Sequence, residues 1–365
     1  MNIQQLQIKN FRCFSDLTIS FNGPYTLLVG DNGTGKTSIL EALYYLCYLR
    51  SFRSSSVQDL IQFDQEAFFV KACFSGNVDD SVQELQVGLS SKKRLVKLNR
   101  NAIASYKDIL AYYRVVSLTE DDLWLIKGGP EVRRAYVDHA LFLVDHTYVD
   151  LFKQHKIIVS NRNAILQNSV ADKSSYEVWT EQLFHVACRL ADLRVAWLHD
   201  VQERVNRLLQ QYISADIAIQ FNYVSRKNIR DTDYASFKDV HMDLYAQEMR
   251  LKRSLFGVHL DDVAITFQGK RSRQFASRGQ QKMIVLLMKI AQIQLLESFE
   301  GMRLFLLDDF MTDFDEQRLR TMLAILFDLN CQLVFTVPSS GSLLESLLLG
   351  KGGECTALTI CKEAP

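Results

Sequence analysis

The sequence predicts an α/β fold in which a long, mostly helical segment separates a β-rich start from an α/β end. The main observation is that residues 131–256 contain neither glycine nor proline. Helices tolerate neither residue well and most turns require one of them, so this segment is expected to be mostly helical. Residues 1–115 instead alternate short β-rich runs with turn residues, and residues 302–365 have a strand–helix–strand pattern. We therefore expect the two ends of the chain to fold together.

The composition excludes several classes of protein. Lys and Arg number 42 and so do Asp and Glu in a chain of 365 residues, so the formal net charge is zero and any nucleic-acid-binding surface must be local. No apolar run is long enough to span a membrane and the N-terminus lacks the apolar core of a secretory signal, so we expect a cytoplasmic protein with no membrane partner. Seven scattered cysteines without a CxxC pair favour reduced thiols over a disulfide framework or a zinc site.

The predicted elements follow the chain in order. Runs rich in β-branched and aromatic residues predict strands at 17–21, 25–29, 67–74, 84–89 and 93–98. An apolar helix is expected at 37–49. Residues 176–212 show the clearest helical periodicity, with apolar residues at three- and four-residue steps, and would span about 55 Å as one helix. The runs 131–169 and 238–256 are expected to pack against it as a bundle. The end of the chain predicts a buried strand at 303–307, a helix at 316–329 and a buried strand at 332–337.

Residues 30–37, with the sequence GDNGTGKT, form a complete GxxxxGK[ST] phosphate loop between a predicted strand and a predicted helix. The glycines let successive backbone N–H groups point into one cavity, and the helix N-terminus adds partial positive charge. Lys36 is expected to reach the β- and γ-phosphates of ATP, and the Thr37 hydroxyl to bind Mg²⁺. The residues expected to bind the nucleotide are Gly30, Asp31, Asn32, Gly33, Thr34, Gly35, Lys36, Thr37 and Ser38.

The predicted strand 304–307 delivers two carboxylates, Asp308 and Asp309, to its C-terminal edge, where the ligand sites of α/β sheets lie. Asp308 is expected to hold Mg²⁺ directly or through water, and Asp309 to polarise an attacking water. An ordinary strand end with solvated acids has the same pattern, but the phosphate loop upstream favours the functional interpretation. Lys36, Asp308 and Asp309 are therefore the candidate catalytic residues, and Thr37 and Asp308 the candidate metal ligands.

A third motif, Ser277-Arg278-Gly279-Gln280, precedes the apolar run 283–290. A Ser-x-Gly-Gln turn that starts a helix offers exposed N–H groups, a serine donor and a glycine for close backbone approach, which suits an anion. Alone, the motif is better explained as a helix N-cap. Its position between the phosphate loop and the acidic pair is what makes it informative.

The order of phosphate loop, long insertion, Ser-x-Gly-Gln signature and acidic strand resembles the ATP-binding-cassette (ABC) ATPases of chromosome maintenance and double-strand-break repair. The closer resemblance is to the RecF family. It is carried by NFR at 10–12, LEALY at 40–44, RSFR at 50–53, DL at 122–123, KGGP at 127–130, RR at 133–134, GVHLDD at 257–262 and LLDD at 306–309. The resemblance implies an ABC-type phosphate-loop ATPase core formed by residues 1–115 and 296–365, and an inserted, mostly helical lobe at 116–295 that carries the signature.

Some positions depart from the related patterns. Val258 and Leu260 replace the proline and arginine that the RecF family usually has after the glycine at 257. The acidic pair is Asp-Asp, as in RecF, whereas most cassette ATPases have Asp-Glu, and the shorter carboxylate of Asp309 argues against fast hydrolysis. Thr336 occupies the position of the histidine that transporter ATPases carry, which argues against a transporter subunit.

The resemblance also implies a mechanism. Two copies would meet head to tail, each holding Mg-ATP between its own phosphate loop and the Ser277, Gly279 and Gln280 of the other. ATP would close this dimer on duplex DNA near single-strand gaps, and slow, regulatory, DNA-dependent hydrolysis would open it. The family acts in DNA replication, recombinational repair and the SOS response to DNA damage, and helps to load RecA with RecO and RecR. An open alternative is a nucleotide-gated scaffold in which ATP binding, not hydrolysis, is the functional step.

Basic residues gather in the sequence around the signature, at Arg250, Lys252, Arg253, Lys270, Arg271, Arg273, Arg278 and Lys282. Such residues can neutralise DNA phosphates without reading the base sequence, and the candidate DNA contacts are Lys252, Arg253, Lys270, Arg271 and Arg273. A solvated surface explains the same charges. Arg12, Arg50 and Arg53 are further candidates for nucleotide or DNA contact, and His259 is open between a structural role and one near the nucleotide or dimer interface.

Overall fold

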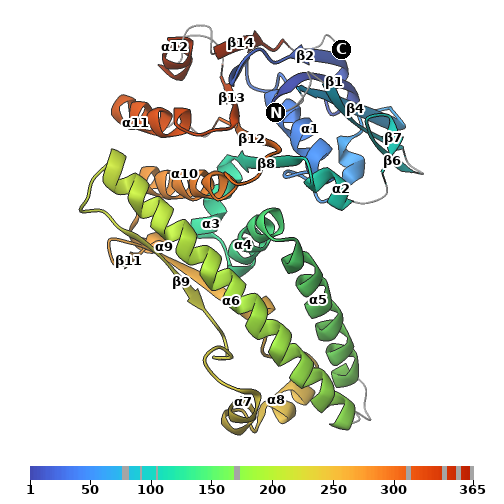
Figure 1. The fold of residues 1–365 in the computed structure, drawn as a ribbon, viewed down its shortest axis with the longest axis vertical. Coiled ribbons are helices and arrows are strands. Elements are labelled where there is room, and N and C mark those ends of the chain that lie inside the picture. The colour runs from blue at the N-terminus through green and yellow to red at the C-terminus, as the bar shows by residue number, and fades with distance from the viewer. Residues whose placement is uncertain are drawn as a thin grey trace. The chain divides into compact units, whose positions relative to one another are not determined.

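A computed structural model describes residues 1–75, 82–90, 93–103, 106–167, 173–309, 314–338, 343–350 and 355–361 (Figure 1). The chain divides into two compact units. Unit 1 comprises Met1–Asp122 and Lys289–Pro365, and unit 2 comprises Leu123–Met288. The two ends of the chain therefore belong to the same unit. The sequence predicted divisions at 115/116 and 295/296.

A parallel sheet of five strands forms one layer of unit 1, in the order β14-β3-β13-β12-β8. Its strands are β3 (Tyr25–Val29), β8 (Tyr113–Leu118), β12 (Met302–Leu307), β13 (Gln332–Val337) and β14 (Cys355–Thr359). The central strands β3 and β13 are buried along their whole length, as expected when both faces of a parallel sheet are covered. Because the strands run in one direction, β3, β13 and β12 end side by side at one edge, where Val29 pairs with Val337 and Leu307 with Phe335.

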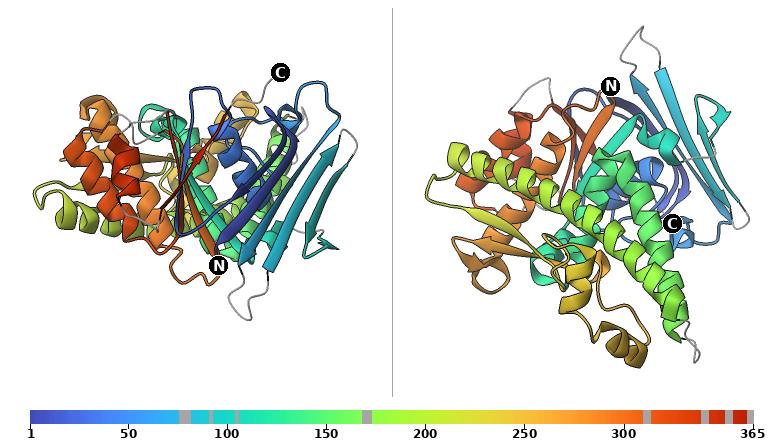
Figure 2. Two further views of the ribbon diagram at one scale, coloured as in Figure 1. Left: turned by 90° about the horizontal axis from the view of Figure 1, so that it is seen from above. Right: turned by 60° about the horizontal axis from the view of Figure 1, so that its bottom comes forward.

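An antiparallel sheet of six strands forms a second layer of unit 1, in the order β2-β1-β4-β5-β6-β7. Its strands are β1 (Ile3–Phe11), β2 (Phe14–Ser20), β4 (Ala67–Ser75), β5 (Val82–Ser90), β6 (Arg94–Leu98) and β7 (Asn101–Ala102). Helix α1 (Lys36–Tyr48) contacts β1, β4 and β5 of this sheet and β8 and β13 of the parallel sheet. It lies between the two layers (Figure 2) and is buried almost throughout, so it forms the core of the unit.

Shorter helices complete unit 1. They are the 3₁₀ helices η1 (Val57–Leu60) and η2 (Glu120–Leu123, which reaches the division between the units) and the helices α2 (Tyr106–Leu110), α11 (Glu316–Phe327) and α12 (Leu343–Leu349). The predicted strands at 25–29 and 332–337 and the helix at 37–49 are confirmed to within a residue. Strands β8 and β14 were not predicted, and the sequence boundary at 115/116 cuts through β8.

Unit 2 is built on one long helix, α6 (Lys173–Tyr212), whose 40 residues span about 60 Å. This confirms the helix predicted at 176–212. Helices α4 (Pro130–Val144) and α5 (His146–Gln167) pack against it, and α5 runs beside it in Figure 1. Unit 2 also contains the helical elements α3 (Trp124–Lys127), α7 (Tyr234–Val240), α8 (Leu244–Leu251), η3 (Val258–Leu260) and α9 (Ser272–Phe275). Helix α10 (Arg278–Gln294) begins in unit 2 and ends in unit 1. Among the described residues, no helix is long and apolar enough to cross a membrane.

One part of the segment expected to be mostly helical is a strand. β9 (Ile219–Val224) pairs with β10 (Asp262–Phe267), which pairs with β11 (Lys270–Arg271), in a three-stranded antiparallel sheet. The first residues of β9 alternate between buried and exposed, a period of two that favours a strand. The absence of glycine and proline therefore predicted helix wrongly at β9, because the turns on either side of this strand are formed by other residues.

A buried ion pair fixes α8 to the two long helices of unit 2. The side chains of Arg162 on α5 and Glu248 on α8 are both fully buried and form a salt bridge. Arg162 also donates to the Tyr176 hydroxyl at 2.7 Å and to Ser254 Oγ at 2.8 Å, and Glu248 accepts from the backbone N–H of Leu255 at 2.6 Å. Every charge in this cluster has partners, which is the condition under which a buried ion pair is tolerated.

Candidate functional site

The phosphate loop joins β3 to α1 in unit 1 and depends on glycine at two close approaches. Gly35 has φ +100°, a left-handed conformation, and a Cβ there would lie 2.4 Å from the Phe14 ring and 2.6 Å from Cys13 Sγ. A Cβ on Gly30 would lie 2.5 Å from the carbonyl oxygen of Ile360. Any side chain at either position would push the loop out of its present path, so the loop conformation follows from the glycines of the motif.

Lys36 is held within the loop. Its side chain is only 5% exposed, and Nζ donates to the carbonyl oxygens of Gly30 at 2.6 Å and Asp31 at 3.1 Å. The Thr34 hydroxyl also donates to the Asp31 carbonyl, at 3.0 Å. The charged group is thus fixed in the position from which it can reach an anion in the loop.

The acidic residues meet the phosphate loop at the edge where β3, β13 and β12 end. The Thr37 hydroxyl donates to Asp308 Oδ1 at 2.9 Å, across 271 residues of sequence. Thr336 lies on β13, the strand between β3 and β12. Its hydroxyl is 2.9 Å from Asp308 Oδ1 and 3.2 Å from Asp309 Oδ1. Burial raises the pKa of Asp308 and the nearby Asp309 raises it further, while the two threonine hydrogen bonds act in the opposite direction.

Asp309 has an unusual backbone conformation, with φ +46°. Its backbone N–H donates to Thr336 Oγ1 at 2.8 Å. The left-handed conformation turns the chain as it leaves β12, and the Asp309 side chain lines the cavity of the phosphate loop. Thr336, which the sequence singled out only as a replacement for histidine, therefore holds both acidic residues.

Two arginines from outside the motif line the same cavity. Arg12 and Arg53 are both paired with Glu41, a fully buried residue of α1. Arg12 donates Nε–H to Glu41 Oε2 at 2.8 Å and Nη2–H to Oε1 at 2.7 Å, whereas Arg53 Nη1 is 3.7 Å from Oε2. The hydrogen bonds to Glu41 raise the pKa of Arg12. Arg50, the third candidate, is not part of the cavity wall; burial raises the pKa of Tyr44, and the nearby Arg50 acts in the opposite direction.

The cavity has a volume of about 510 Å³, within the range of about 300–1,000 Å³ that is typical of sites for small molecules and cofactors. Its wall carries three cationic side chains, of Arg12, Lys36 and Arg53, so it suits an anionic ligand of nucleotide size. The other lining residues are Cys13, Asn32, Gly33, Gly35, Thr37, Ser38, Asp59, Ile61 and Asp309. Cys13, Asp59 and Ile61 carry no sequence signal, because they reach the cavity through the pairing of β1 with β2 and the fold of η1.

The Ser-x-Gly-Gln motif begins α10 in unit 2. The backbone N–H of Ser277 donates to Gln280 Oε1 at 2.8 Å and the N–H of Gln280 donates to Ser277 Oγ at 3.3 Å. This is a reciprocal capping box, which stabilises a helix start. Ser277 is exposed and Gly279 half-buried, so the cap is open to solvent.

The candidate DNA contacts fall into two groups. All five are exposed, but Lys252 and Arg253 follow α8, whereas Lys270, Arg271 and Arg273 belong to β11 and α9. Figure 1 shows α8 at the opposite end of unit 2 from β11 and α9, so the single cluster in the sequence is not a single surface. Lys282, grouped with them in the sequence, is buried with 1% exposure.

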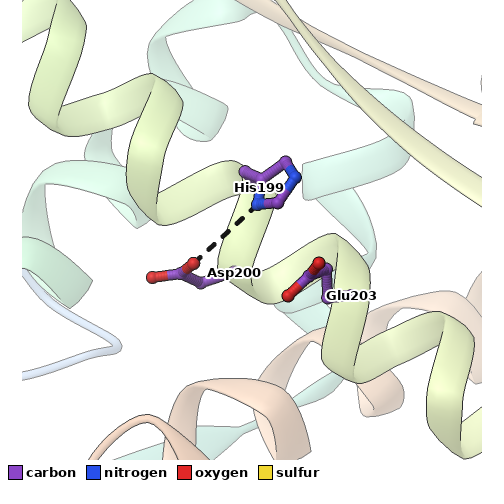
Figure 3. A group of neighbouring side chains, drawn as sticks. All are labelled: His199, Asp200 and Glu203. Atoms are coloured by element: carbon purple, nitrogen blue, oxygen red, sulfur yellow. Dashed lines mark ion pairs between the residues drawn. The ribbon is translucent and has the colours of Figure 1, made fainter.

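The histidines of unit 2 give no support for a metal or acid–base site. Burial lowers the pKa of His259 to about 4 and that of its neighbour His155 to about 3, so both rings are neutral at physiological pH. His199, Asp200 and Glu203 on α6 offer ligand atoms within 4.8 Å of one another (Figure 3). All three are exposed to solvent and the ion pair between His199 and Asp200 is long, at 3.9 Å, so we assign no metal to them.

The comparison with known proteins identifies the family. A family model described as the RecF/RecN/SMC N terminal domain matches residues 2–344. The DNA replication and repair protein RecF of Geobacter sp. strain M21 is 30% identical in an alignment 348 residues long, which covers 93% of this chain and 93% of that protein. The chain belongs to the RecF family.

Solved structures confirm the fold of this RecF-family chain. The structure of the recombination mediator protein RecF-ATP in the RecFOR pathway superimposes with a TM-score of 0.82 at 24% identity, covering 93% of this chain and 92% of that one. An SmcHead bound to the C-winged helix domain of ScpA gives a TM-score of 0.54 at 14% identity, covering 95% and 92%. The predicted fold class, an ABC-type α/β core with an inserted helical lobe, is therefore confirmed.

Proposed function

We propose that this RecF-family chain is an ATP-dependent DNA clamp of recombinational gap repair. The observation that carries the proposal is the hydrogen bond of 2.9 Å between Thr37 and Asp308, which joins the phosphate loop to the acidic strand at the edge of a nucleotide-sized cavity. Relatives named as DNA replication and repair proteins, and a structural neighbour described as RecF-ATP in the RecFOR pathway, support the same assignment.

ATP binds in the unit 1 cavity in this proposal. The N–H groups of residues 32–37 surround the phosphates, and Lys36, Arg12 and Arg53 neutralise their charge. Thr37 and Asp308 hold Mg²⁺, because a hydroxyl and a carboxylate are the oxygen ligands that this ion prefers, and the desolvated Asp308 carboxylate gains most from a nearby cation. Mg²⁺ supplies charge neutralisation of the phosphate oxygens. Asp309 orients the attacking water.

A second copy completes the site in trans. The Ser277–Gln280 turn, in which Ser277 is exposed, offers a hydroxyl and helix N-terminal N–H groups to the γ-phosphate bound by the other copy. Because the Ser277 N–H and hydroxyl already bond to Gln280, phosphate binding exchanges the capping hydrogen bonds for contacts with the nucleotide. These contacts exist only in the closed dimer, so ATP shifts the population towards it.

DNA binding is assigned to exposed lysines and arginines that contact phosphates without reading the sequence. The candidate residues are the five exposed side chains of Lys252, Arg253, Lys270, Arg271 and Arg273. Closure on duplex DNA next to a single-strand gap, followed by loading of RecA together with RecO and RecR, is the biological role proposed for the cycle.

A nucleotide-gated scaffold is the second candidate, favoured by one observation. The short carboxylate of Asp309 lies 3.2 Å from the Thr336 hydroxyl, and the Asp309 backbone is anchored to the same group. A carboxylate held in this way has little freedom to activate water, so turnover would be slow and ATP binding itself would be the functional step. Clamp release that depends on ATP hydrolysis supports the first candidate, and release without hydrolysis supports the second.

The test is the mass of the chain in solution, measured by light scattering with and without Mg-ATP. Wild type should be monomeric without nucleotide and reach twice that mass with Mg-ATP, and Asp309→Asn should be a more stable dimer because it retains ATP. Ser277→Arg should remain monomeric, since the bulky cation blocks the trans contact. Monomers under all conditions would reject the composite site.

A further inference from the structure

Among the described residues of unit 1, the most exposed large apolar side chain lies at the tip of a tight turn beside the nucleotide cavity. Phe63 is 88% exposed. The N–H of Gln65 donates to the Gln62 carbonyl at 3.1 Å, and Asp64 has φ +61°, so Phe63 and Asp64 occupy the two central positions of a β-turn. A single exposed apolar side chain is common on a protein surface, so the exposure of Phe63 is informative only together with the position of its turn.

The turn is anchored to the wall of the nucleotide cavity. The residue before it, Ile61, lines that cavity, and the N–H of Gln62 donates to the Asn10 carbonyl at 2.8 Å. The turn also carries negative charge, because Asp64 and Glu66 are exposed and form no ion pair among the described residues. Residues 63–66, which we call the acidic-aromatic turn, thus present one aromatic ring beside two carboxylates.

Unit 2 contains a cavity with complementary properties. Its volume is about 220 Å³, below the range of small-molecule sites, so it suits one inserted side chain rather than a nucleotide. It lies between α3, α4 and the strands β9 and β10, and its apolar wall is formed by Leu125, Ile126, Val224, Val263, Ala264 and Ile265. We call it the unit 2 cavity. Helices α3 and α9, which contact each other and supply lining residues, each also carry an exposed aromatic residue, Trp124 on α3 and Phe275 on α9.

Only some of the polar groups of the unit 2 cavity have partners. Arg133 and Asp262 neutralise each other, with Nε–Oδ1 and Nη2–Oδ2 distances of 2.7 and 2.9 Å. Arg271 and Arg273 line the same cavity and have no acidic partner in the described part of the chain. Ser272, fully buried between them, has an Oγ without a hydrogen-bond partner. The cavity has apolar walls, and two guanidinium groups and one hydroxyl in it have no partner among the described residues. Such a site suits an apolar side chain that is followed by a carboxylate.

We propose that the acidic-aromatic turn of one copy of this chain inserts Phe63 into the unit 2 cavity of a second copy, with Asp64 paired to Arg271 or Arg273. The inference rests on the head-to-tail dimer of the proposed function, and it identifies a contact that holds that dimer closed. The turn borders the cavity that binds ATP, and Arg273 is four residues before Ser277. When Ser277 of one copy reaches the ATP of the other, these two surfaces therefore belong to the same interface.

Symmetry doubles the contribution of this contact. In a twofold head-to-tail dimer, each copy inserts its own turn and receives the turn of the other. Aromatic and arginine side chains at a desolvated pocket are the usual residues that dominate an interface. In this proposal Arg271 and Arg273, which the sequence predicted to contact DNA, instead contact the second copy. The experiment must therefore distinguish dimer contact from DNA binding by these two residues.

The experiment measures dimerisation in Mg-ATP over a dilution series by light scattering. Phe63→Ala should raise the concentration at half-dimerisation by about 10- to 100-fold for each of the two contacts, the value expected for losing a buried phenylalanine. Asp64→Arg and Arg271→Glu should each weaken the dimer. The chain that carries both substitutions should dimerise again, because every copy supplies one partner to each contact. Met242→Ala, at a residue that is 83% exposed on unit 2, is the matched control and should have no effect.

Two further readouts keep the outcomes distinct. Binding of a fluorescent ATP analogue to the dilute monomer should be unchanged in Phe63→Ala, since this side chain does not line the nucleotide cavity. If Ser277→Arg abolishes the dimer and the Phe63 and Asp64 variants leave it intact, this inference is wrong and the proposed function stands. If wild type itself does not dimerise, the proposed function fails first. Weaker DNA binding by Arg271→Glu with an unchanged dimer would assign the unit 2 cavity to DNA and overturn the inference.

Discussion

The pairing of Arg12 with Glu41 allows a quantitative prediction, because the two partners differ in burial. The Glu41 side chain is fully buried, whereas that of Arg12 is 22% exposed at the edge of the nucleotide cavity. The perturbations are Arg12→Met, which keeps the apolar stem, and Glu41→Gln, which keeps the shape and removes the charge. Either change breaks the same two charge-assisted hydrogen bonds, of 2.8 and 2.7 Å.

The cost should be larger on the arginine side. Arg12→Met leaves a buried carboxylate with only Ser51 and the more distant Arg53, and losing one partner of a buried pair costs about 3–5 kcal/mol. Glu41→Gln leaves a guanidinium that water can reach and that still donates to the amide oxygen, so we expect about 1–2 kcal/mol. The double variant should lose less than the sum, with a coupling energy of at least about 1 kcal/mol.

Urea unfolding followed by circular dichroism measures these free energies. Arg320→Met is the control, since Arg320 and Glu316 form an exposed pair for which a loss of less than about 1 kcal/mol is expected. Equal destabilisation by the two single variants, or additive effects in the double variant, would refute the reasoning from burial. Both variants should also weaken the binding of an ATP analogue, because Glu41 holds Arg12 and Arg53 at the cavity wall.

Three further predictions concern the acidic strand, the buried ion pair of unit 2 and the phosphate loop. Asp308→Asn should abolish Mg²⁺-dependent ATP binding yet raise the melting temperature by about 1–3 °C at pH 7–8. The melting temperature rises because burial raises the pKa of the Asp308 carboxyl and so disfavours its charged form in the folded chain. This gain should vanish near pH 3, where the wild-type carboxyl is protonated in both the folded and the unfolded state. Glu248→Gln should cost about 3–5 kcal/mol in urea unfolding, since it leaves the Arg162 charge buried with its ionic partner lost. Gly35→Ala should prevent binding of an ATP analogue while leaving far-ultraviolet circular dichroism unchanged, because its Cβ collides with Phe14 and distorts only the loop.

Features with a strong local pattern were predictable from the sequence. β3 and β13 are continuous apolar runs, and α1 follows a motif that fixes its start. The phosphate loop and the acidic pair were predicted separately, and their meeting follows from the rule that parallel strands end at one edge. Thr37 and Asp308 are 271 residues apart in the sequence, yet this rule brings them together.

Features that depend on long-range pairing were not predictable. β9 lies in a segment without glycine or proline and becomes a strand only because β10 pairs with it. Glu41 has the sequence appearance of an ordinary helix residue, and its role follows from the position of α1 between two sheets, which buries it against Arg12 and Arg53. The unit 2 cavity gathers residues from α3, β10 and α9, and no local pattern connects them.

A mixing experiment with two inactive variants shows whether the phosphate loop and the signature act across two copies. Lys36→Ala should lose ATP binding in its own phosphate loop, and Ser277→Arg should lose the trans contact, so each variant alone should stay monomeric with Mg-ATP. In a mixed dimer one site combines the intact phosphate loop of one copy with the intact signature of the other. The account predicts that mixing restores a complex of twice the monomer mass. If the mixture stays monomeric while wild type dimerises, the two motifs do not act across copies and the composite site is contradicted.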